Sequence, residues 1–213
     1  KEYRRQRQMC IRDRYQLARV ELVKGCLARK EYDRALKLIE ECYVYPHNLG
    51  EGKLPGAQEN DFNYYKARIL QETGHADEAR ALYEAASVGN SQPAAAIYYN
   101  DQKPDKIFYQ GLALLRLGRE TEARSRFNNL ISYGEKHLYD VFKMDYFAVS
   151  LPDLQIWEDD MDRKNVIHCN YLMGLGYLGL GDKTKAEKYF AAAAELDNNH
   201  QGVQVHRMML NEK

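Results

Sequence analysis

The sequence is poor in proline and has no cysteine spacing typical of a metal site or a disulfide framework. Five prolines in 213 residues favour helices over a β-sandwich or a disordered chain. The four cysteines show no CxxC spacing, so we expect small buried thiols in a reducing compartment. They are Cys10, Cys26, Cys42 and Cys169.

Long apolar runs and a surplus of charge are also missing. No segment approaches the roughly 20 apolar residues of a membrane helix, and no secretory signal opens the chain. Lys and Arg together number 31, as do Asp and Glu, which is unlike the basic composition of nucleic-acid-binding proteins. We therefore expect a cytoplasmic protein that binds neither a membrane nor nucleic acid.

Residues 1–14 differ from the rest. The string Arg7–Arg14 (RQMCIRDR) resembles the read-through of a sequencing adapter in contaminated metagenomic assemblies. We expect 1–14 to be an artefact, a disordered segment or a helix extension, and exclude them from the fold. They hold six Lys or Arg and two Asp or Glu, so residues 15–213 hold 25 basic and 29 acidic residues. The remainder is mildly acidic.

A repeated amphipathic pattern is present from residue 15 onward. After Ile107, apolar residues keep helical spacing up to Leu117, Gly118 permits a turn, and a second helix carries Ala123 and Phe127 on one face. One hairpin cannot bury both its apolar faces, so it needs neighbours of the same kind. Equivalent alanines recur at steps of 44, 44 and 63 residues, at Ala35, Ala79, Ala123 and Ala186.

This register predicts an all-α, right-handed solenoid of about four helical hairpins in a single domain, 15–213. Asp61 is the expected N-cap of the second hairpin, and the third hairpin is expected to end near Gly134. Val203–Leu210 is predicted to form a helix that caps the open end. The expected hairpins are 15–42, 61–87, 105–133 and 166–196, and the inserts are 43–60, 88–104 and 134–165.

The order small residue, turn glycine, alanine, aromatic and small residue resembles the tetratricopeptide repeat (TPR) family over roughly residues 15–200. That resemblance implies a scaffold that binds proteins. The family's repeat is about 34 residues long, so the connectors here are extended, and the first hairpin has Lys30 in place of the turn glycine. The fourth hairpin carries the full set as Gly174, Gly181, Ala186, Phe190 and Ala193.

A narrower resemblance concerns segments 47–61, 98–102 and 145–153. They are similar to the C-terminal region of large uncharacterised bacterial proteins, in which a mutarotase-like β-sandwich of suspected carbohydrate function precedes the repeats. This resemblance implies that an upstream domain of the same polypeptide is a partner, with a possible carbohydrate link.

Equivalent positions of the first helices form ladders that line the concave groove of such a solenoid. We predict that this ladder binds a peptide or helix of a partner, because aromatic rings bury area at a low entropic cost. Packing between hairpins and homo-oligomerisation through the groove are the alternatives. The groove lacks a Lys/Asn pattern that would clamp a terminal carboxylate. The ladder residues are Tyr64, Phe108 and Tyr171, and one turn further on Arg68, Leu112 and Leu175.

The connectors form a second candidate surface, because loops that leave second helices lie on one edge of a solenoid. Their aromatic and amide groups suit sugars or a docking domain; the alternative is that they cover hairpin ends. The residues are Tyr45, His47, Asn48, Tyr98, Tyr99, Asn100, Asp101, Tyr146, Asp153 and Trp157.

Other motifs have simpler explanations. The glycines of 174–179 match a dinucleotide fingerprint but follow a predicted helix rather than a strand, so we interpret them as repeat residues. The acidic run 158–162 lacks the glycine and terminal glutamate of a calcium loop, and His168-Cys169 has no second ligand pair. With no catalytic triad near any histidine, we predict a non-catalytic interaction or docking module without cofactor or metal. The alternative is an accessory region that completes a carbohydrate-processing active site.

Overall fold

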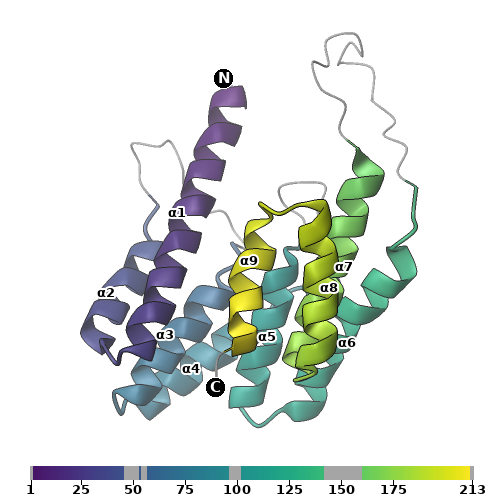
Figure 1. Cartoon of the computed structure of the whole chain (residues 1–213). Helices are drawn as coiled ribbons and strands as arrows, with labels where there is room; N and C mark the ends of the chain where they lie inside the picture. Colours follow the sequence, from purple (N-terminus) through teal and green to yellow (C-terminus); the bar gives the residue numbers. More distant parts are fainter. Residues whose placement is uncertain (1, 46–52, 54–56, 96–101, 142–159, 212–213) are drawn as a thin grey trace. The chain divides into compact units, whose positions relative to one another are not determined.

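The computed structural model describes residues 2–45, 53, 57–95, 102–141 and 160–211, with side chains from residue 12 onward. All regular secondary structure within these ranges is helical, which confirms the predicted all-α fold class (Figure 1). None of these helices is both long and apolar enough to cross a membrane. The elements are α1 (Glu2–Ala28), α2 (Tyr32–Cys42), α3 (Asn60–Glu72), α4 (Ala76–Ser87), α5 (Pro104–Arg116), α6 (Glu120–His137), α7 (Met161–Gly179), α8 (Lys183–Leu196), α9 (Gln201–Met208) and η3 (Met209–Asn211).

Four pairs of helices are joined by turns of one geometry. In each turn, a backbone amide donates to the carbonyl five residues earlier at 2.9–3.0 Å, from Glu31, His75, Arg119 and Asp182. The residue before each donor has a positive φ, which glycine adopts without steric cost. Three of them are the predicted turn glycines: Gly74, Gly118 and Gly181, at φ +86°, +74° and +81°. The first turn uses Lys30 at φ +60° instead.

The alanine register is confirmed by burial. The four alanines are at most 2% exposed, and the residues four and seven positions later are buried on the same helical face. A small residue at the first position lets the paired helices approach, and the larger one fills the space beside it. The larger residues are Ile39, Tyr83, Phe127 and Phe190.

The chain divides into two compact units, which we describe separately. The first comprises Lys1–Asn90 and Tyr109–Ala123. In it α1 pairs with α2, α3 pairs with α4, and α3 also contacts α1 and α2. The Asn60 side chain donates to the carbonyls of Ala86 and Val88, at 2.8 and 2.9 Å, and so caps the end of α4. The predicted N-cap was wrong: Glu59 holds that position and Asp61 lies in the first turn of α3.

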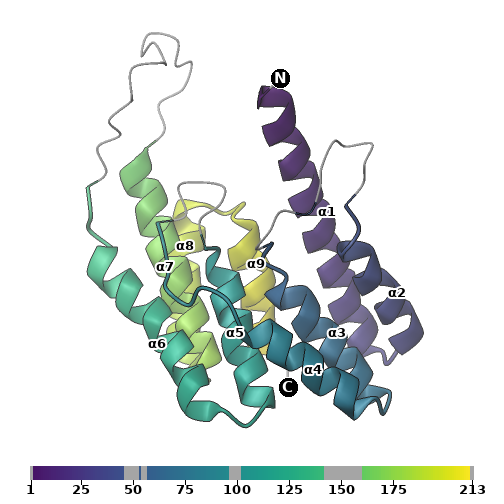
Figure 2. The same cartoon turned by 180° about the vertical axis from the view of Figure 1, so that it is seen from behind.

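The second unit comprises Ser91–Phe108 and Arg124–Lys213. Here α7 and α8 form an antiparallel hairpin (Figure 2), and α9 packs against both of them. The carboxylates of Asp160 and Asp182 accept from backbone amides at 2.9 and 3.0 Å and cap α7 and α8. Helix α6 continues to His137, past the end predicted near Gly134, and α7 begins at Met161, inside the predicted insert 134–165.

Candidate functional site

Four tyrosines form the base of a surface where α3 and α5 meet in the first unit. The Tyr64 ring lies 5.2 to 5.9 Å from the rings of Tyr65, Tyr83 and Tyr109. The hydroxyls of Tyr65 and Tyr109 are 3.3 Å apart, and the Tyr83 hydroxyl donates to Gln71 Oε1 at 2.8 Å. All four rings are buried. Packing and hydrogen bonds together hold this layer in one arrangement.

Two arginines lie at the rim of the tyrosine layer. The Arg68 guanidinium is 6.0 Å from the centroid of the Tyr65 ring, and Arg116 lies near enough to Tyr64 for that side chain to raise its pKa. Burial raises the pKa of Tyr83 to about 12, although the nearby Arg116 and Arg68 oppose this rise. Burial disfavours the charge of Arg116, yet interactions with Tyr64 raise its pKa. Arg116 therefore keeps its positive charge beside the tyrosine layer.

We call the solvent-facing group above these tyrosines the α3–α5 surface, and define it as Arg68, Glu72, Leu112, Leu115 and Arg116. Arg68 and Leu112 are half-buried, and the other three are exposed, with Leu115 at 40%. Neither arginine forms a salt bridge with a carboxylate among the described residues. Glu72 accepts a hydrogen bond from Tyr32 of α2 at 3.4 Å. The surface therefore combines two cations, one acid and two aliphatic side chains.

The three aromatic ladder residues, Tyr64, Phe108 and Tyr171, are buried. Their burial favours packing between hairpins, the alternative that the sequence left open. Tyr64 belongs to the tyrosine layer of the first unit. In the second unit, Phe108 and Tyr171 both contact His206 of α9, with ring centroids 5.5 and 5.8 Å apart. Leu175 is fully buried. Of the six predicted ladder residues, Arg68 and Leu112 are half-buried and the other four are buried.

Helix α9 is fastened to the second unit by specific contacts. His206 Nδ1 lies 3.1 Å from the Tyr171 hydroxyl and 2.8 Å from the Gly202 carbonyl. A Cβ on Gly202 would lie 2.6 Å from the Tyr171 hydroxyl, so only glycine allows this approach. Arg207 forms an ion pair with Glu187 of α8. The predicted terminal helix thus exists, and it covers the Phe108–Tyr171 part of the ladder.

The glycine fingerprint of α7 serves helix packing. Gly174, Gly176 and Gly179 lie inside a helix, and an added Cβ would approach other atoms within 2.5, 2.5 and 2.2 Å. The atoms belong to Phe190 for the first, Ile131 and the Phe127 carbonyl for the second, and the Phe127 ring for the third. Such spacing lets α6 and α8 pack closely on α7. The interpretation as repeat residues is confirmed for Gly174, and the other two serve the contact with α6.

Tyr45 is the one predicted connector residue that the structure describes. Its hydroxyl donates to Glu59 Oε1 at 3.4 Å, and the Arg12 guanidinium lies 3.4 Å above its ring. These contacts hold Tyr45 within the first unit. The others lie outside the described residues, so their clustering stays a prediction: His47, Asn48, Tyr98, Tyr99, Asn100, Asp101, Tyr146, Asp153 and Trp157.

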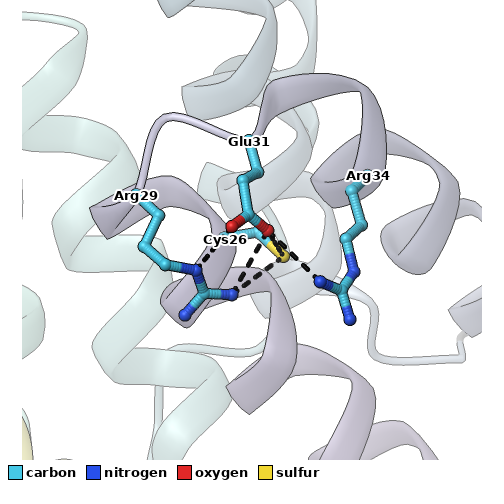
Figure 3. Close-up of polar contacts among 4 residues, drawn as sticks. All are labelled: Cys26, Arg29, Glu31 and Arg34. Atoms are coloured by element: carbon cyan, nitrogen blue, oxygen red, sulfur yellow. Dashed lines mark hydrogen bonds and ion pairs between the residues drawn. The ribbon is translucent and has the colours of Figure 1, made fainter.

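A charged cluster stabilises the turn between α1 and α2 (Figure 3). Glu31 accepts from Arg29 Nε at 2.7 Å and from Arg34 at 3.4 Å, and the buried Cys26 thiol lies 3.5 Å from its carboxylate. The hydrogen bond from Arg29 lowers the pKa of Glu31 to about 2. Charge-assisted hydrogen bonds therefore hold the one turn that lacks glycine.

Metal and thiol chemistry receive no support from the geometry of the described ranges. No group of three or more His, Cys, Asp or Glu side chains there is arranged to hold a metal ion. The side chains of Cys26, Cys42 and Cys169 are buried, as predicted. Burial raises the pKa of Cys169 to about 11, which disfavours the reactive thiolate.

Arg116 was not predicted from the sequence, and of the four tyrosines beneath it only Tyr64 was predicted to belong to the site. Arg116 lies one turn beyond Leu112 on α5, so extending the predicted ladder by four residues finds it. Tyr83 stands at the aromatic position of the second hairpin, so its burial could be predicted. Tyr109 carries no comparable signal, because its role depends on contacts between α3 and α5.

Comparisons with known proteins bear on the hairpins. The chain is similar to the solved structure of YrrB, described as a TPR protein with an unusual peptide-binding site, at 13% identity over 89% of this chain and 90% of YrrB, with a TM-score of 0.26. The family model of the tetratricopeptide repeat matches residues 167–200. This segment covers the larger part of α7 and all of α8, so the fourth hairpin contains a tetratricopeptide repeat.

Proposed function

We propose that this chain is a non-catalytic protein-interaction module that binds a peptide segment of a partner. The partner is either a separate protein or an upstream domain of the same polypeptide. The observation that carries the proposal is the α3–α5 surface, where Arg68 and Arg116 present their charges to solvent beside Leu112 and Leu115. The tetratricopeptide repeat in the fourth hairpin supports it.

The layer beneath the surface suits this role. Arg68 and Arg116 are long side chains that lose conformational entropy when a ligand immobilises them. Contacts with Tyr65 and Tyr64 already restrict them, so less entropy remains to be lost on binding. The hydroxyl pair of Tyr65 and Tyr109 restricts the layer in turn. A surface ordered in advance binds more tightly than a flexible one of the same composition.

Isothermal titration calorimetry of the whole 213-residue chain against pools of decapeptides tests this proposal. We expect at least one pool to bind with micromolar affinity, and substitution of Leu112 by Ser to weaken that binding. A result in which none of the pools gives heat with the chain would refute the proposal.

The accessory role in a carbohydrate-processing enzyme depends on the connectors. In Tyr45, the described member of that set, the hydroxyl donates its hydrogen to Glu59, so it has no further hydrogen to donate.

A further inference from the structure

We infer that the α3–α5 surface recognises an acidic peptide segment, in which Asp or Glu side chains stand beside an apolar residue. The inference rests on the proposed function and adds the chemical class of the partner. It excludes a terminal carboxylate as the main determinant, because Arg68 and Arg116 come from two different helices and suit carboxylates spaced along a peptide.

Arg68 and Arg116 differ from several other cations of the first unit, which form salt bridges with carboxylates. Lys66 pairs with Glu40 at 2.6 Å, Arg29 with Glu31 at 2.7 Å, and Arg119 with Glu122 at 2.7 Å. Each of those side chains has a carboxylate that neutralises it. Arg68 and Arg116 contact tyrosine instead, so their charge remains available to an anion.

The α3–α5 surface contains one acidic residue, Glu72. Glu72 is near enough to Arg116 to contribute to its raised pKa. The Glu72 carboxylate also accepts a hydrogen bond from the Tyr32 hydroxyl at 3.4 Å. One carboxylate cannot neutralise two guanidinium groups, so a positive charge remains on the surface.

The two arginines of the α3–α5 surface do not recur at the equivalent positions of the fourth hairpin. The positions equivalent to Arg68 and Arg116 in the fourth hairpin are Leu175 and Gly179, which are uncharged and packed inside the second unit. Tyr171, one turn before Leu175, is covered by α9 through His206. The hairpin pattern itself therefore does not require arginine at these positions, and packing does not account for both charges.

The apolar part of the partner follows from Leu112 and Leu115. Leu115 is 40% exposed and lies next to Arg116 in sequence, while Leu112 is one helical turn before Arg116. A peptide that places a carboxylate on each arginine brings its intervening side chain over these leucines. An aliphatic or aromatic residue there would bury apolar area.

Fluorescence anisotropy with the whole chain tests the inference. The probe is a fluorescein-labelled peptide of three Glu-Leu pairs separated by glycine, and its partner carries Gln for every Glu. We expect the Glu peptide to bind at least tenfold more tightly, and its affinity to fall as salt rises. Arg68→Gln and Arg116→Gln should each weaken binding about tenfold, the effect of losing one charge-assisted contact.

The matched control is Arg119→Gln, which removes an arginine of the same unit that is already paired with Glu122 and should change the affinity less than twofold. Equal binding of the two peptides overturns the inference and leaves the proposed function standing, whereas no binding of either peptide or of any pool overturns both. An equal loss in Arg119→Gln, full competition by inorganic phosphate at the peptide's concentration, or tighter binding of a single-stranded oligonucleotide also overturns the acidic-peptide assignment. Unchanged melting temperatures show that the variants fold.

Discussion

The contact between α6 and α7 gives a sharp prediction for Gly176→Ala. A Cβ at position 176 would lie 2.7 Å from the Phe127 carbonyl oxygen and 2.5 Å from Ile131 Cγ1. Ile131 can change rotamer, but the carbonyl belongs to the backbone of α6. Ordinary contact begins near 3.4 Å, so the two helices must separate by roughly 0.7 Å.

Two opposing effects set the size of the change. Overpacking of this kind costs about 1–3 kcal/mol, while alanine gains about 1 kcal/mol over glycine in a helix. We therefore expect Gly176→Ala to lower the free energy of unfolding by up to about 2 kcal/mol. For a chain of this length, each kcal/mol of lost stability lowers the melting temperature by about 2–4 °C.

Gly25→Ala in α1 is the matched control. An added Cβ there meets only the Arg29 guanidinium, 3.3 Å away, at the end of a flexible side chain. Its helix-propensity gain should appear almost intact, as about 0.5–1 kcal/mol of stabilisation. Urea unfolding followed by far-ultraviolet circular dichroism measures both variants. If Gly176→Ala stabilises the protein as much as Gly25→Ala does, the close approach of α6 to α7 is refuted.

Three further predictions concern the first turn and a buried thiol. Because the pKa of Glu31 is lowered from 4.5 to about 2, its stabilising effect is full above pH 4.5 and is lost as pH falls through 2. Glu31→Gln should therefore lower the melting temperature at pH 7 and lower it much less at pH 2. Lys30→Gly should raise stability by about 1 kcal/mol in urea unfolding, because Lys30 has φ +60°, and a loss of stability would contradict this. Cys169, with its pKa raised to about 11, should react with iodoacetamide at pH 8 far more slowly in the folded than in the unfolded protein, as mass spectrometry of the labelled peptide can show.

The hairpins could be predicted because their determinants are local in sequence. The spacing from Gly118 to Ala123 and Phe127 sets a turn and a buried face within ten residues, and the same spacing recurs in the other hairpins. The first turn, which has Lys30 in place of glycine, keeps the same geometry, because the Glu31 amide still donates a hydrogen bond to the Cys26 carbonyl.

The site was predicted only in part, because its arrangement depends on contacts between distant segments. Periodicity placed Arg68 and Leu112 on the correct helical faces. It could not show that His206 would cover Phe108 and Tyr171, since a ladder position is exposed or buried according to what packs upon it. Gly176 was likewise unexplained by the repeat, because its partner is the backbone of α6.

The glycine contact between α6 and α7 also limits how far the fourth hairpin is an interchangeable module. In a repeat array, stability depends on each repeat and on the interface with its neighbour. Gly134 of α6 faces the backbone of α7 at Cys169, just as Gly176 faces the backbone of α6. Transplanting α7 and α8 behind a hairpin without a glycine equivalent to Gly134 would bring a side chain against a carbonyl. The unit of exchange in this chain is therefore the pair of helices α6–α7, which crosses the boundary between two repeats.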